Sequence, residues 1–464
     1  MNQKLEAYKA WIKNQRVAVI GLGISNTPLV EYLGRLGVNI TVFDKSEPEA
    51  LKDKIQALKD YNVEFSLGKD YLSRLKGFDV IFKTPIVRPD IPEFLAEKER
   101  GATITSEMEV FFDLCPAEIL AVTGSDGKTT TTTMIYELMK AQGYHCYLGG
   151  NIGTPLLNRI DGITSEDKIV LELSSFQLLT MRKSPHVAVI TNLSPNHLDV
   201  HTSMEEYVDA KKNIYRHQQK GDLAVFNADN AITNALKQEA ADQSVFFSRT
   251  QELKTGAFLK NDILCYRDDS GTTEYLHKKE LALPGDHNVE NYLAAIAATK
   301  AYVSADTAVR VGKSLKGIEH RIEFVRELNG VKYYNDSIGS SPSRTMATLN
   351  AFDQRVILIA GGYDKKIPYD PLGDVLIEKT KHLILIGQTA SLIEMALMRR
   401  LKGKNRGLDL RITHCSTLRQ AVDCAYLSAK PGDIVLLSPA SASFDMFKNF
   451  EERGRKFKEY VMAL

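Results

Sequence analysis

Short apolar runs rich in β-branched residues recur along the chain and alternate with segments of helical pattern. Such alternation is typical of a parallel β-sheet covered by helices. It occurs in three groups, whose first strands are expected within residues 16–23 (RVAVIGLG), 117–124 (AEILAVTG) and 355–362 (RVILIAGG). We therefore expect an α/β protein with three domains, spanning residues 1–106, 107–317 and 318–464. Residues 246–285 have the pattern of β-hairpins.

Composition narrows the classes of protein that fit. A chain of 464 residues is too long for one hydrophobic core, and 59 Lys and Arg against 58 Asp and Glu leave no excess charge for nucleic acid or membranes. No run reaches the roughly 20 apolar residues of a membrane span, and the first residues lack the apolar core of a signal peptide. The five cysteines form no CxxC pair. We expect a protein of the reducing cytoplasm without nucleic-acid or membrane partners.

A glycine loop, Thr123-Gly124-Ser125-Asp126-Gly127, follows one apolar run and leads into a helical segment that begins Lys128-Thr129-Thr130. The glycines allow backbone N–H groups to point at an anion, and the lysine would neutralise nucleotide phosphates. A threonine hydroxyl there would bind Mg²⁺. The ordinary phosphate loop has four residues between its first glycine and Gly-Lys, whereas this one has two. The alternative is a plain glycine turn before a helix.

A second glycine motif lies at residues 19–26 (VIGLGISN), and Asp44 ends the next apolar run. A helix N-terminus that binds phosphate and an acidic residue that meets a ribose would have this spacing. Thr27 stands where the dinucleotide fingerprint has its third glycine. A nucleotide-type ligand and a tight strand-to-helix turn both remain open on these residues alone.

The shortened loop and nine further segments resemble the Mur ligase family and the related folylpolyglutamate synthetases. In order along essentially the whole chain, these segments are 149–156 (GGNIGTPL), 171–178 (LELSSFQL), 191–201 (TNLSPNHLDVH), 210–215 (AKKNIY), 285–295 (GDHNVENYLAA), 319–324 (EHRIEF), 334–342 (YNDSIGSSP), 360–372 (AGGYDKKIPYDPL) and 437–454 (LSPASASFDMFKNFEERG). The last segment is most similar to glutamate-adding members. The resemblance implies Rossmann-like first and third domains around a central P-loop ATPase-like domain with a mostly parallel sheet.

The resemblance also implies an activity. Members of the family join an amino acid to a UDP-linked muramoyl carboxylate, which first accepts the γ-phosphate of ATP and is then attacked by the amine. For this chain it implies D-glutamate and UDP-N-acetylmuramoyl-L-alanine as substrates, release of ADP and phosphate, a role in peptidoglycan precursor synthesis, and a monomer. Because two anions meet in the first step, the site needs cations, for which Lys128 and Mg²⁺ are the candidates.

Matching the motifs residue by residue assigns roles around the nucleotide. The residues expected to bind ATP are Gly124, Ser125, Asp126, Gly127, Lys128, Thr129, Thr130, Asn288, Asn291 and Arg321. Two Mg²⁺ ions are expected near Thr129, Glu172, His197 and Lys211, and the catalytic residues would be Lys128, His197 and Lys211. The resemblance implies that CO₂ carbamylates Lys211 into a carboxylate-like ligand. Lys212 is its rival, although it lies about 100° around a helix.

The remaining matches concern the two other substrates. The UDP-sugar would lie near Ile24, Ser25, Asp44, Thr84, Asn151 and Ser174, which favours UDP over NAD as the ligand of the first glycine motif. The amino acid would lie near Ser340, Lys365, Ser443, Phe444 and Phe450, with Lys366 as an alternative to Lys365. A dicarboxylic substrate needs at least one cation and several donors, which this set contains.

Several positions depart from the family pattern and keep alternatives open. Ile338 replaces a lysine, Phe444 replaces a leucine, and Asp126 replaces an asparagine. An L-glutamate-adding relative is therefore a second candidate. A folylpolyglutamate synthetase is disfavoured by the domain that precedes the loop. A non-catalytic nucleotide-binding protein would not need Glu172, His197 and Lys365 together, and a dehydrogenase would bind NAD tightly.

Overall fold

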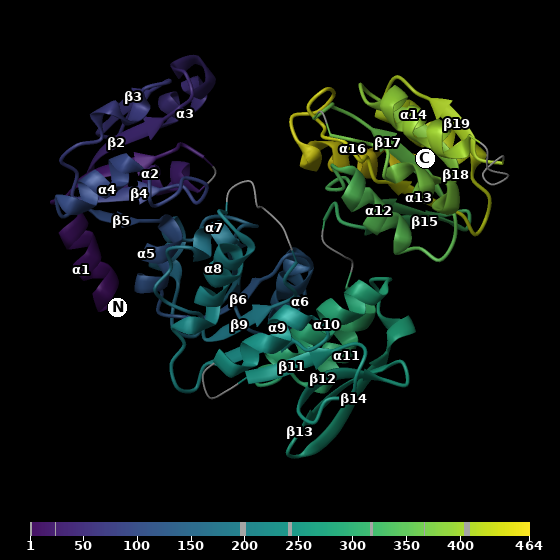
Figure 1. Ribbon diagram of the computed structural model, residues 1–464, viewed down its shortest axis with the longest axis horizontal. Coiled ribbons are helices and arrows are strands. Elements are labelled where there is room, and N and C mark those ends of the chain that lie inside the picture. The colour runs from purple at the N-terminus through teal and green to yellow at the C-terminus, as the bar shows by residue number, and fades with distance from the viewer. Residues whose placement is uncertain are drawn as a thin grey trace. The chain divides into compact units, whose positions relative to one another are not determined.

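The computed structural model describes residues 2–23, 25–194, 201–239, 244–315, 319–365, 367–402 and 409–464. The chain forms two compact units (Figure 1), one of Met1–Lys278 with Glu290–Val311 and one of Lys279–Val289 with Gly312–Leu464. Two sheets belong to the first unit and one to the second. The expected α/β class with mostly parallel sheets is confirmed.

The N-terminal sheet has five parallel strands in the order β3-β2-β1-β4-β5. The strands are β1 (Arg16–Ile20), β2 (Asn39–Asp44), β3 (Val63–Leu67), β4 (Val80–Lys83) and β5 (Thr103–Thr105). The strand order reverses between β1 and β4. In open parallel sheets, ligands bind outside the carboxyl ends of the strands at such a switch point. The first glycine motif directly follows β1 and therefore lies at this point.

The second sheet has nine strands in the order β14-β13-β12-β11-β10-β9-β6-β8-β7. They are β6 (Glu118–Thr123), β7 (Cys146–Gly150), β8 (Lys168–Glu172), β9 (Val187–Ile190), β10 (Leu223–Asn227), β11 (Ser244–Ser248), β12 (Gly256–Lys260), β13 (Ile263–Asp268) and β14 (Gly271–His277). The antiparallel pairs β12–β13 and β13–β14 confirm the expected hairpins, but β11 pairs in parallel with both its neighbours. The hairpin region thus begins later than the sequence pattern indicates.

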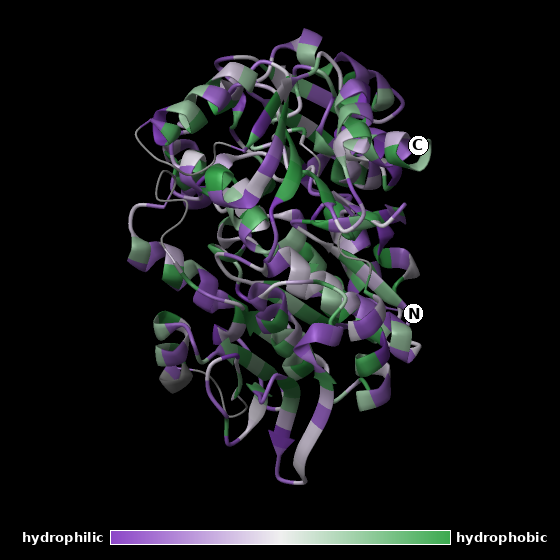
Figure 2. Ribbon diagram, turned by 90° about the vertical axis from the view of Figure 1, so that its right-hand side faces the viewer, coloured by the Kyte–Doolittle hydropathy of each residue, from purple (hydrophilic) through white to green (hydrophobic). Residues whose placement is uncertain are grey.

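The sheet of the second unit has six strands in the order β15-β16-β20-β17-β18-β19. They are β15 (Glu323–Leu328), β16 (Val331–Asn335), β17 (Val356–Gly361), β18 (Thr380–Ile386), β19 (Arg411–His414) and β20 (Ile434–Leu437), and only β15 is antiparallel to its neighbour. Along β17, Val356 and Leu358 face one hydrophobic core, whereas Ile357 and Ile359 face another. A strand covered on both faces has this unbroken apolar sequence, and Figure 2 shows the hydrophobic colour concentrated on the central strands.

Helices cover these sheets. They are α1 (Gln3–Ile12), α2 (Asn26–Arg35), α3 (Lys52–Ala57), α4 (Pro92–Glu99), α5 (Glu107–Leu114), α6 (Lys128–Gln142), α7 (Ser175–Leu178), α8 (Met204–Arg216), α9 (Ala231–Ala235), α10 (Asp286–Thr299), α11 (Ala305–Ser314), α12 (Pro342–Asn350), α13 (Leu372–Lys379), α14 (Ala390–Leu401), α15 (Leu418–Ser428) and α16 (Phe450–Met462). Short 3₁₀ turns are η1 (Pro48–Leu51), η2 (Tyr71–Arg74), η3 (Leu157–Gly162), η4 (Leu236–Glu239) and η5 (Lys278–Glu280). None of the helices within the described ranges is long and apolar enough to cross a membrane.

The two-sided core of the second unit predicts a large difference between two leucines. Leu358 is 0% exposed and Leu427 is 82% exposed. Leu358→Ala should lower the free energy of unfolding by about 2–5 kcal/mol, because it leaves a cavity in β17. Leu427→Ala should change it by less than about 0.5 kcal/mol. Chemical denaturation of the full chain, followed by circular dichroism, measures both, and equal losses would contradict the packing described.

Candidate functional site

The loop between β6 and α6 contains two glycines that no other residue can replace without a collision. Gly124 has φ 150° and Gly127 has φ 77°, both in the region that favours glycine. A Cβ atom at Gly124 would lie 1.9 Å from Thr191 Oγ1, and one at Gly127 would lie 2.3 Å from Asn291 Oδ1. The loop is therefore pressed against the end of β9 and against α10.

Lys128 is the first residue of α6 and folds back over this loop. Its Nζ donates hydrogen bonds to the carbonyl oxygens of Gly124, at 3.0 Å, and Ser125, at 2.9 Å. The N-terminus of a 15-residue helix adds partial positive charge at the same place. A helix N-terminus after a glycine loop with an adjacent ammonium group is suited to binding phosphate.

A carboxylate lies beside the loop at the carboxyl end of the neighbouring strand, β8. Glu172 is 2% exposed; its Oε2 accepts a 2.6 Å hydrogen bond from Thr129 Oγ1 and its Oε1 accepts one of 2.8 Å from Asn151 Nδ2. Carboxylate and hydroxyl oxygens are ligands that suit Mg²⁺. The described residues contain no group of three or more His, Cys, Asp and Glu side chains that could hold a metal ion. A metal at this place would need further oxygen ligands.

Lys211 approaches the same loop from α8. The residue is 1% exposed, and its Nζ donates hydrogen bonds to Thr123 Oγ1 at 3.0 Å and to the Gly124 carbonyl at 2.8 Å. Burial and repulsion from Lys128 hold the pKa of Lys211 well below its ordinary value, although Glu172 acts in the opposite direction. Lys212 instead pairs with Glu239 at 2.8 Å. Of the two lysines, Lys211 is the one placed at the loop.

The glycine motif after β1 is closed by Asp44 from β2. The two carboxylate oxygens of Asp44 accept hydrogen bonds from the backbone N–H groups of Leu22, at 2.7 Å, and Ser46, at 2.8 Å. Burial opposes ionisation of Asp44, but these hydrogen bonds outweigh it and lower its pKa. A Cβ atom at Gly21 would lie 3.3 Å from Thr84 Cγ2. The structure thus brings Asp44 and Thr84, from separate strands, to one switch point.

Three loops at the carboxyl ends of parallel strands in the second unit carry the residues predicted to bind the amino acid. Ser340 follows β16, Lys365 follows β17, and Ser443 and Phe444 follow β20. Ser443 is 2% exposed, whereas the Phe444 ring is 62% exposed and lies 6.0 Å from the ring of Tyr363. The loop bearing Tyr363 pairs with that of Ser443, because Tyr363 N donates to the Ala442 carbonyl at 2.9 Å.

Comparison with known proteins agrees with this arrangement. A model of the MurD-like N-terminal domain of Mur ligases matches residues 15–106, the Mur ligase middle domain matches 122–299, and the glutamate ligase domain of Mur ligases matches 320–441. The UDP-N-acetylmuramoylalanine–D-glutamate ligase of Acetivibrio thermocellus is 59% identical over 464 residues, which is 100% of both chains. This chain belongs to the Mur ligase family. It is accordingly an ATP-dependent amide ligase.

Further relatives support the assignment to the Mur ligase family. The protein of Ruminiclostridium cellulolyticum that bears the same name is 54% identical over 100% of both chains. Among solved structures, the UDP-N-acetylmuramate–alanine ligase of Thermotoga maritima aligns with a TM-score of 0.59 at 18% identity, covering 97% of this chain and 100% of its own. MurF of Acinetobacter baumannii aligns with a TM-score of 0.59 at 17% identity, covering 84% and 92%. These structures show that the fold is shared.

Other predicted ATP residues of this Mur ligase take different positions. Ser125 and Thr130 are buried, whereas Asp126 is exposed and its backbone N–H donates to Asn192 Oδ1 at 2.9 Å. Asn291 contacts α6, since its Oδ1 accepts a 3.3 Å hydrogen bond from Thr131 Oγ1. Asn288 and Arg321 belong to the second unit, where Asn288 Nδ2 donates to the Pro284 carbonyl at 2.7 Å.

The predicted residues near the substrates also have local structural roles. Ser174 caps α7, in a capping box with Gln177. Ser25 precedes α2 and makes no side-chain capping hydrogen bond there. Phe450 begins α16, and its carbonyl accepts a 2.8 Å hydrogen bond from Ser337 Oγ. The predictions for Ile24, His197 and Lys366 concern positions outside the described residues.

Sequence reasoning missed Tyr207, which lies next to Lys211, and His201, whose ring lies 5.4 Å from the ring of Tyr207. The hydroxyl of Tyr207 lies 2.9 Å from Ser125 Oγ, and the centre of its ring lies 4.9 Å from Lys211 Nζ. His201 is 3% exposed, and its Nε2 lies 2.8 Å from Ser175 Oγ. Tyr207 could have been found, because residues four apart share a helix face. No pattern of this kind in the sequence predicts that His201 is buried near Tyr207.

Two buried ionisable residues, Arg453 and Asp336, each contact the loops of the second unit, and both were also missed. Arg453 is 0% exposed, and its Nη1 donates to the carbonyl of Ser441 at 3.0 Å. Asp336 Oδ2 accepts hydrogen bonds from Ser438 Oγ at 2.7 Å and Thr348 Oγ1 at 2.8 Å. Burial raises the pKa of Asp336 to about 6. These contacts with Ser438 and Ser441 fix the backbone of the segment that leads to Ser443.

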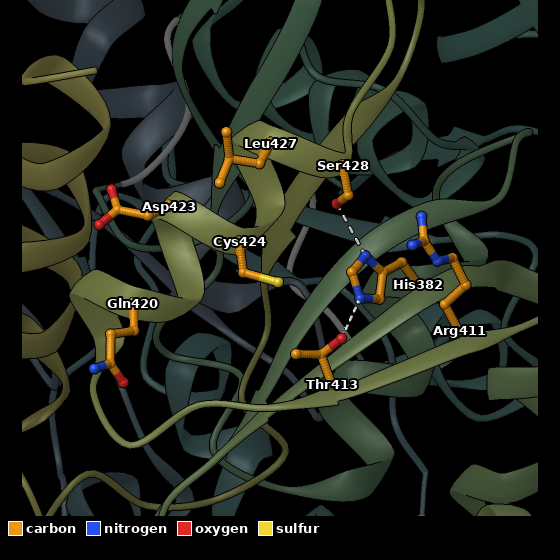
Figure 3. A pocket seen from close by; sticks show the side chains of 8 residues that line it. All are labelled: His382, Arg411, Thr413, Gln420, Asp423, Cys424, Leu427 and Ser428. Carbon is orange, nitrogen blue, oxygen red and sulfur yellow. Dashed lines mark hydrogen bonds between the residues drawn. The ribbon is translucent and has the colours of Figure 1, made fainter.

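A separate pocket of about 470 Å³ lies between α15 and the strands β18 and β19 (Figure 3). Its lining residues are His382, Arg411, Thr413, Gln420, Asp423, Cys424, Leu427 and Ser428. The two ring nitrogens of His382 each lie 2.9 Å from a hydroxyl oxygen, of Ser428 and of Thr413. None of the residues predicted for this Mur ligase's reaction lines it, and His382 and Arg411 lie toward the amino ends of their strands.

If the loop between β6 and α6 binds ATP as the sequence predicts, its close packing predicts that Gly127→Ala weakens ATP binding. The added Cβ would meet Asn291 Oδ1 at 2.3 Å, so either the loop or the Asn291 side chain must shift, and the positive φ of Gly127 adds backbone strain. We expect a loss of affinity of about 10- to 100-fold, as for other displaced positioning groups. Gly143, at the other end of α6, also has positive φ, but a Cβ there would meet nothing within 4 Å.

Gly143→Ala is therefore the matched control, since it carries the backbone cost without the collision. Calorimetric titration of each full-length variant with a non-hydrolysable ATP analogue measures the effect. Equal affinities for the two variants would show that the contact with Asn291 does not position the loop.

Proposed function

We propose that this Mur ligase joins D-glutamate to UDP-N-acetylmuramoyl-L-alanine with ATP, releasing ADP and phosphate, as a step in peptidoglycan precursor synthesis. The observation that carries the proposal is 59% identity, over the full length of both chains, to a protein named UDP-N-acetylmuramoylalanine–D-glutamate ligase. We further propose that it acts as a monomer in the cytoplasm, with domains of residues 1–106, 107–317 and 318–464. Its five cysteines are free thiols, as expected in a reducing compartment.

The first step brings two anions together. The muramoyl-alanine carboxylate attacks the γ-phosphorus of ATP, the bond to the β,γ-bridging oxygen breaks, and an acyl phosphate and ADP result. Lys128 and the N-terminus of α6 supply positive charge at the phosphate loop, in a position set before the reaction begins. His197 is proposed to act beside the acyl phosphate. The amine of glutamate then attacks the acyl carbon and expels phosphate.

Mg²⁺ is proposed to lie beside the loop, as two ions, where Thr129 and Glu172 offer oxygen atoms 2.6 Å apart. The ions would screen the negative charge of the phosphates when bound. His197 and a carbamylated Lys211 would complete the ligand set. The shared orientation of Thr129 and Asn151 toward the buried carboxylate of Glu172 supports this placement.

The surroundings of Lys211 support the proposal that it is carbamylated. Only a neutral amine attacks CO₂, and the low pKa of Lys211 increases the neutral fraction near pH 7. The new N–C bond replaces an N–H bond, a proton is released, and the side chain becomes an anion. An anion beside Lys128 replaces repulsion between two ammonium groups with attraction. It would also add the oxygen ligands that Glu172 and Thr129 alone do not supply.

The amino-acid site is proposed at the strand ends of the second unit. Lys365 is exposed and Ser443 is buried, so the pair offers a cation and a hydroxyl donor for the glutamate carboxylates. Ser340, Phe444 and Phe450 are proposed to complete it. The UDP-sugar is proposed at the first glycine motif with Asp44, Thr84, Ser25 and Ile24, and near Asn151 and Ser174.

Phosphate release from ATP tests the activity and its stereochemistry together. The full-length protein would be incubated with Mg-ATP, UDP-N-acetylmuramoyl-L-alanine and either D- or L-glutamate. We expect release with D-glutamate only, and its loss in Lys128→Ala. Release with L-glutamate only would identify the L-glutamate-adding alternative. No release with either enantiomer would refute the ligase proposal.

The carbamate has its own test. After exposure to ¹³C-labelled bicarbonate, NMR of the wild-type protein should show one bound carbamate carbon, which disappears as the pH falls and protonates the amine. Lys211→Ala should lack the signal and lose about 100-fold in turnover, as for a disrupted metal site. Lys212→Ala is the control, because Lys212 is bonded to Glu239, and it should keep both. A signal that survives in Lys211→Ala would exclude this lysine.

A further inference from the structure

A lysine occupies the last position of β4, where a parallel strand in the middle of a sheet would ordinarily carry an apolar residue. Lys83 is only 2% exposed. It pairs in register with Ile20 of β1, and Ile81, two residues earlier on the same face, packs with Ile20 and Phe43 in a hydrophobic cluster. The stem of Lys83 is therefore embedded in the sheet beside apolar side chains.

The ammonium group of Lys83 is poorly satisfied. Within the described part of the chain, Lys83 Nζ has no hydrogen-bond partner, although it can donate three hydrogen bonds. Its electrostatic partner is Glu109 of α5, whose Oε2 already accepts a 2.8 Å hydrogen bond from Ser106 Oγ. Burial lowers the pKa of Lys83 and raises that of Glu109. An ammonium group on a side chain that is only 2% exposed, with no hydrogen-bond partner in the described residues, can bind an anionic ligand that supplies those partners.

The position of Lys83 limits what that ligand can be. The next residue, Thr84, lies against Gly21 of the first glycine motif, and Asp44 closes the same motif from β2. Lys83 thus ends its strand at the switch point of the N-terminal sheet, where the UDP-linked substrate is proposed to bind. The exposed Lys54 is already engaged there, because its Nζ donates to the Leu22 carbonyl at 2.6 Å.

We propose that Lys83 binds the diphosphate of the UDP-linked substrate and is a substrate-binding residue of this ligase. The inference rests on the proposed function, because it takes the substrate from it. Diphosphate oxygens accept hydrogen bonds from an ammonium group and supply the negative charge that a buried cation lacks. They also offset the cost of burying Lys83, so the group contributes to affinity only when the ligand carries phosphate.

Comparison of UDP with uridine tests this role. Lys83→Met keeps the length of the apolar stem and removes the charge. By calorimetric titration of the full-length protein, we expect the affinity for UDP to fall about 10- to 100-fold, the range for a hydrogen bond to a charged group. The affinity for uridine should stay within about twofold. In the phosphate-release assay, KM for the UDP-linked substrate should rise while KM for ATP stays unchanged.

Two further variants separate ligand binding from structure. Lys83→Met combined with Glu109→Gln removes both buried charges, so the fold no longer carries an unpaired carboxylate; its affinity for UDP should remain as low as in the single variant. Lys76→Met removes an exposed lysine that precedes the amino end of β4 and should leave UDP binding unchanged. Melting curves of every variant report on folding.

The measurements distinguish three possibilities: that Lys83 binds the diphosphate, that it only neutralises Glu109, and that the protein does not bind UDP-linked substrates. Wild-type affinity for UDP in Lys83→Met overturns the proposal, as does an equal loss for UDP and uridine. Recovery of UDP affinity in the double variant would show that Lys83 serves only to neutralise Glu109. If the wild-type protein binds neither UDP nor the UDP-linked substrate, the proposed function itself fails, which is distinct from failure of the assignment of Lys83.

Discussion

The candidate active site depends on the close contact between the β6–α6 loop and two residues outside it, Thr191 and Asn291. The loop has no room for a Cβ atom at Gly124 or Gly127, because Thr191 and Asn291 occupy that space. The carbonyl of Gly124 also accepts hydrogen bonds from Lys128 and Lys211. One short turn therefore fixes the relative positions of the ends of β6 and β9 and of the helices α6, α8 and α10.

The charges at this loop are arranged in a way that favours anions. Lys128 and Lys211 both donate to the carbonyl of Gly124, and repulsion from Lys128 adds to burial in lowering the pKa of Lys211. Glu172 compensates only in part, and it is shared between Thr129 and Asn151. Phosphate and a carbamate would both relieve this imbalance. Lys83 is a second largely buried lysine; burial opposes its charged form, the carboxylate of Glu109 favours it, and we propose that Lys83 also binds an anion.

Much of the fold could be predicted because it follows from local patterns. The unbroken apolar run of β17 predicts a strand covered on both faces, and the short loop before Lys128 predicts a phosphate site and the family. The hairpins were placed too early, because β11 has the same apolar pattern as a hairpin strand and only its pairing distinguishes it. The 100° step between neighbouring helix residues predicts that Lys211 and Lys212 point in different directions, and their contacts with Thr123 and with Glu239 differ accordingly.

The sequence by itself determined the class of fold and the positions of the glycine turns that follow β1 and β6, because these depend on backbone preferences and on residues close together in the chain. Only the tertiary structure decided which charged groups are buried. Arg453 beneath the Ser443 loop, Asp336 with its raised pKa and Lys83 near Glu109 have ordinary sequence surroundings. These side chains are buried by segments that lie far apart in the chain. No local sequence pattern therefore predicts their burial.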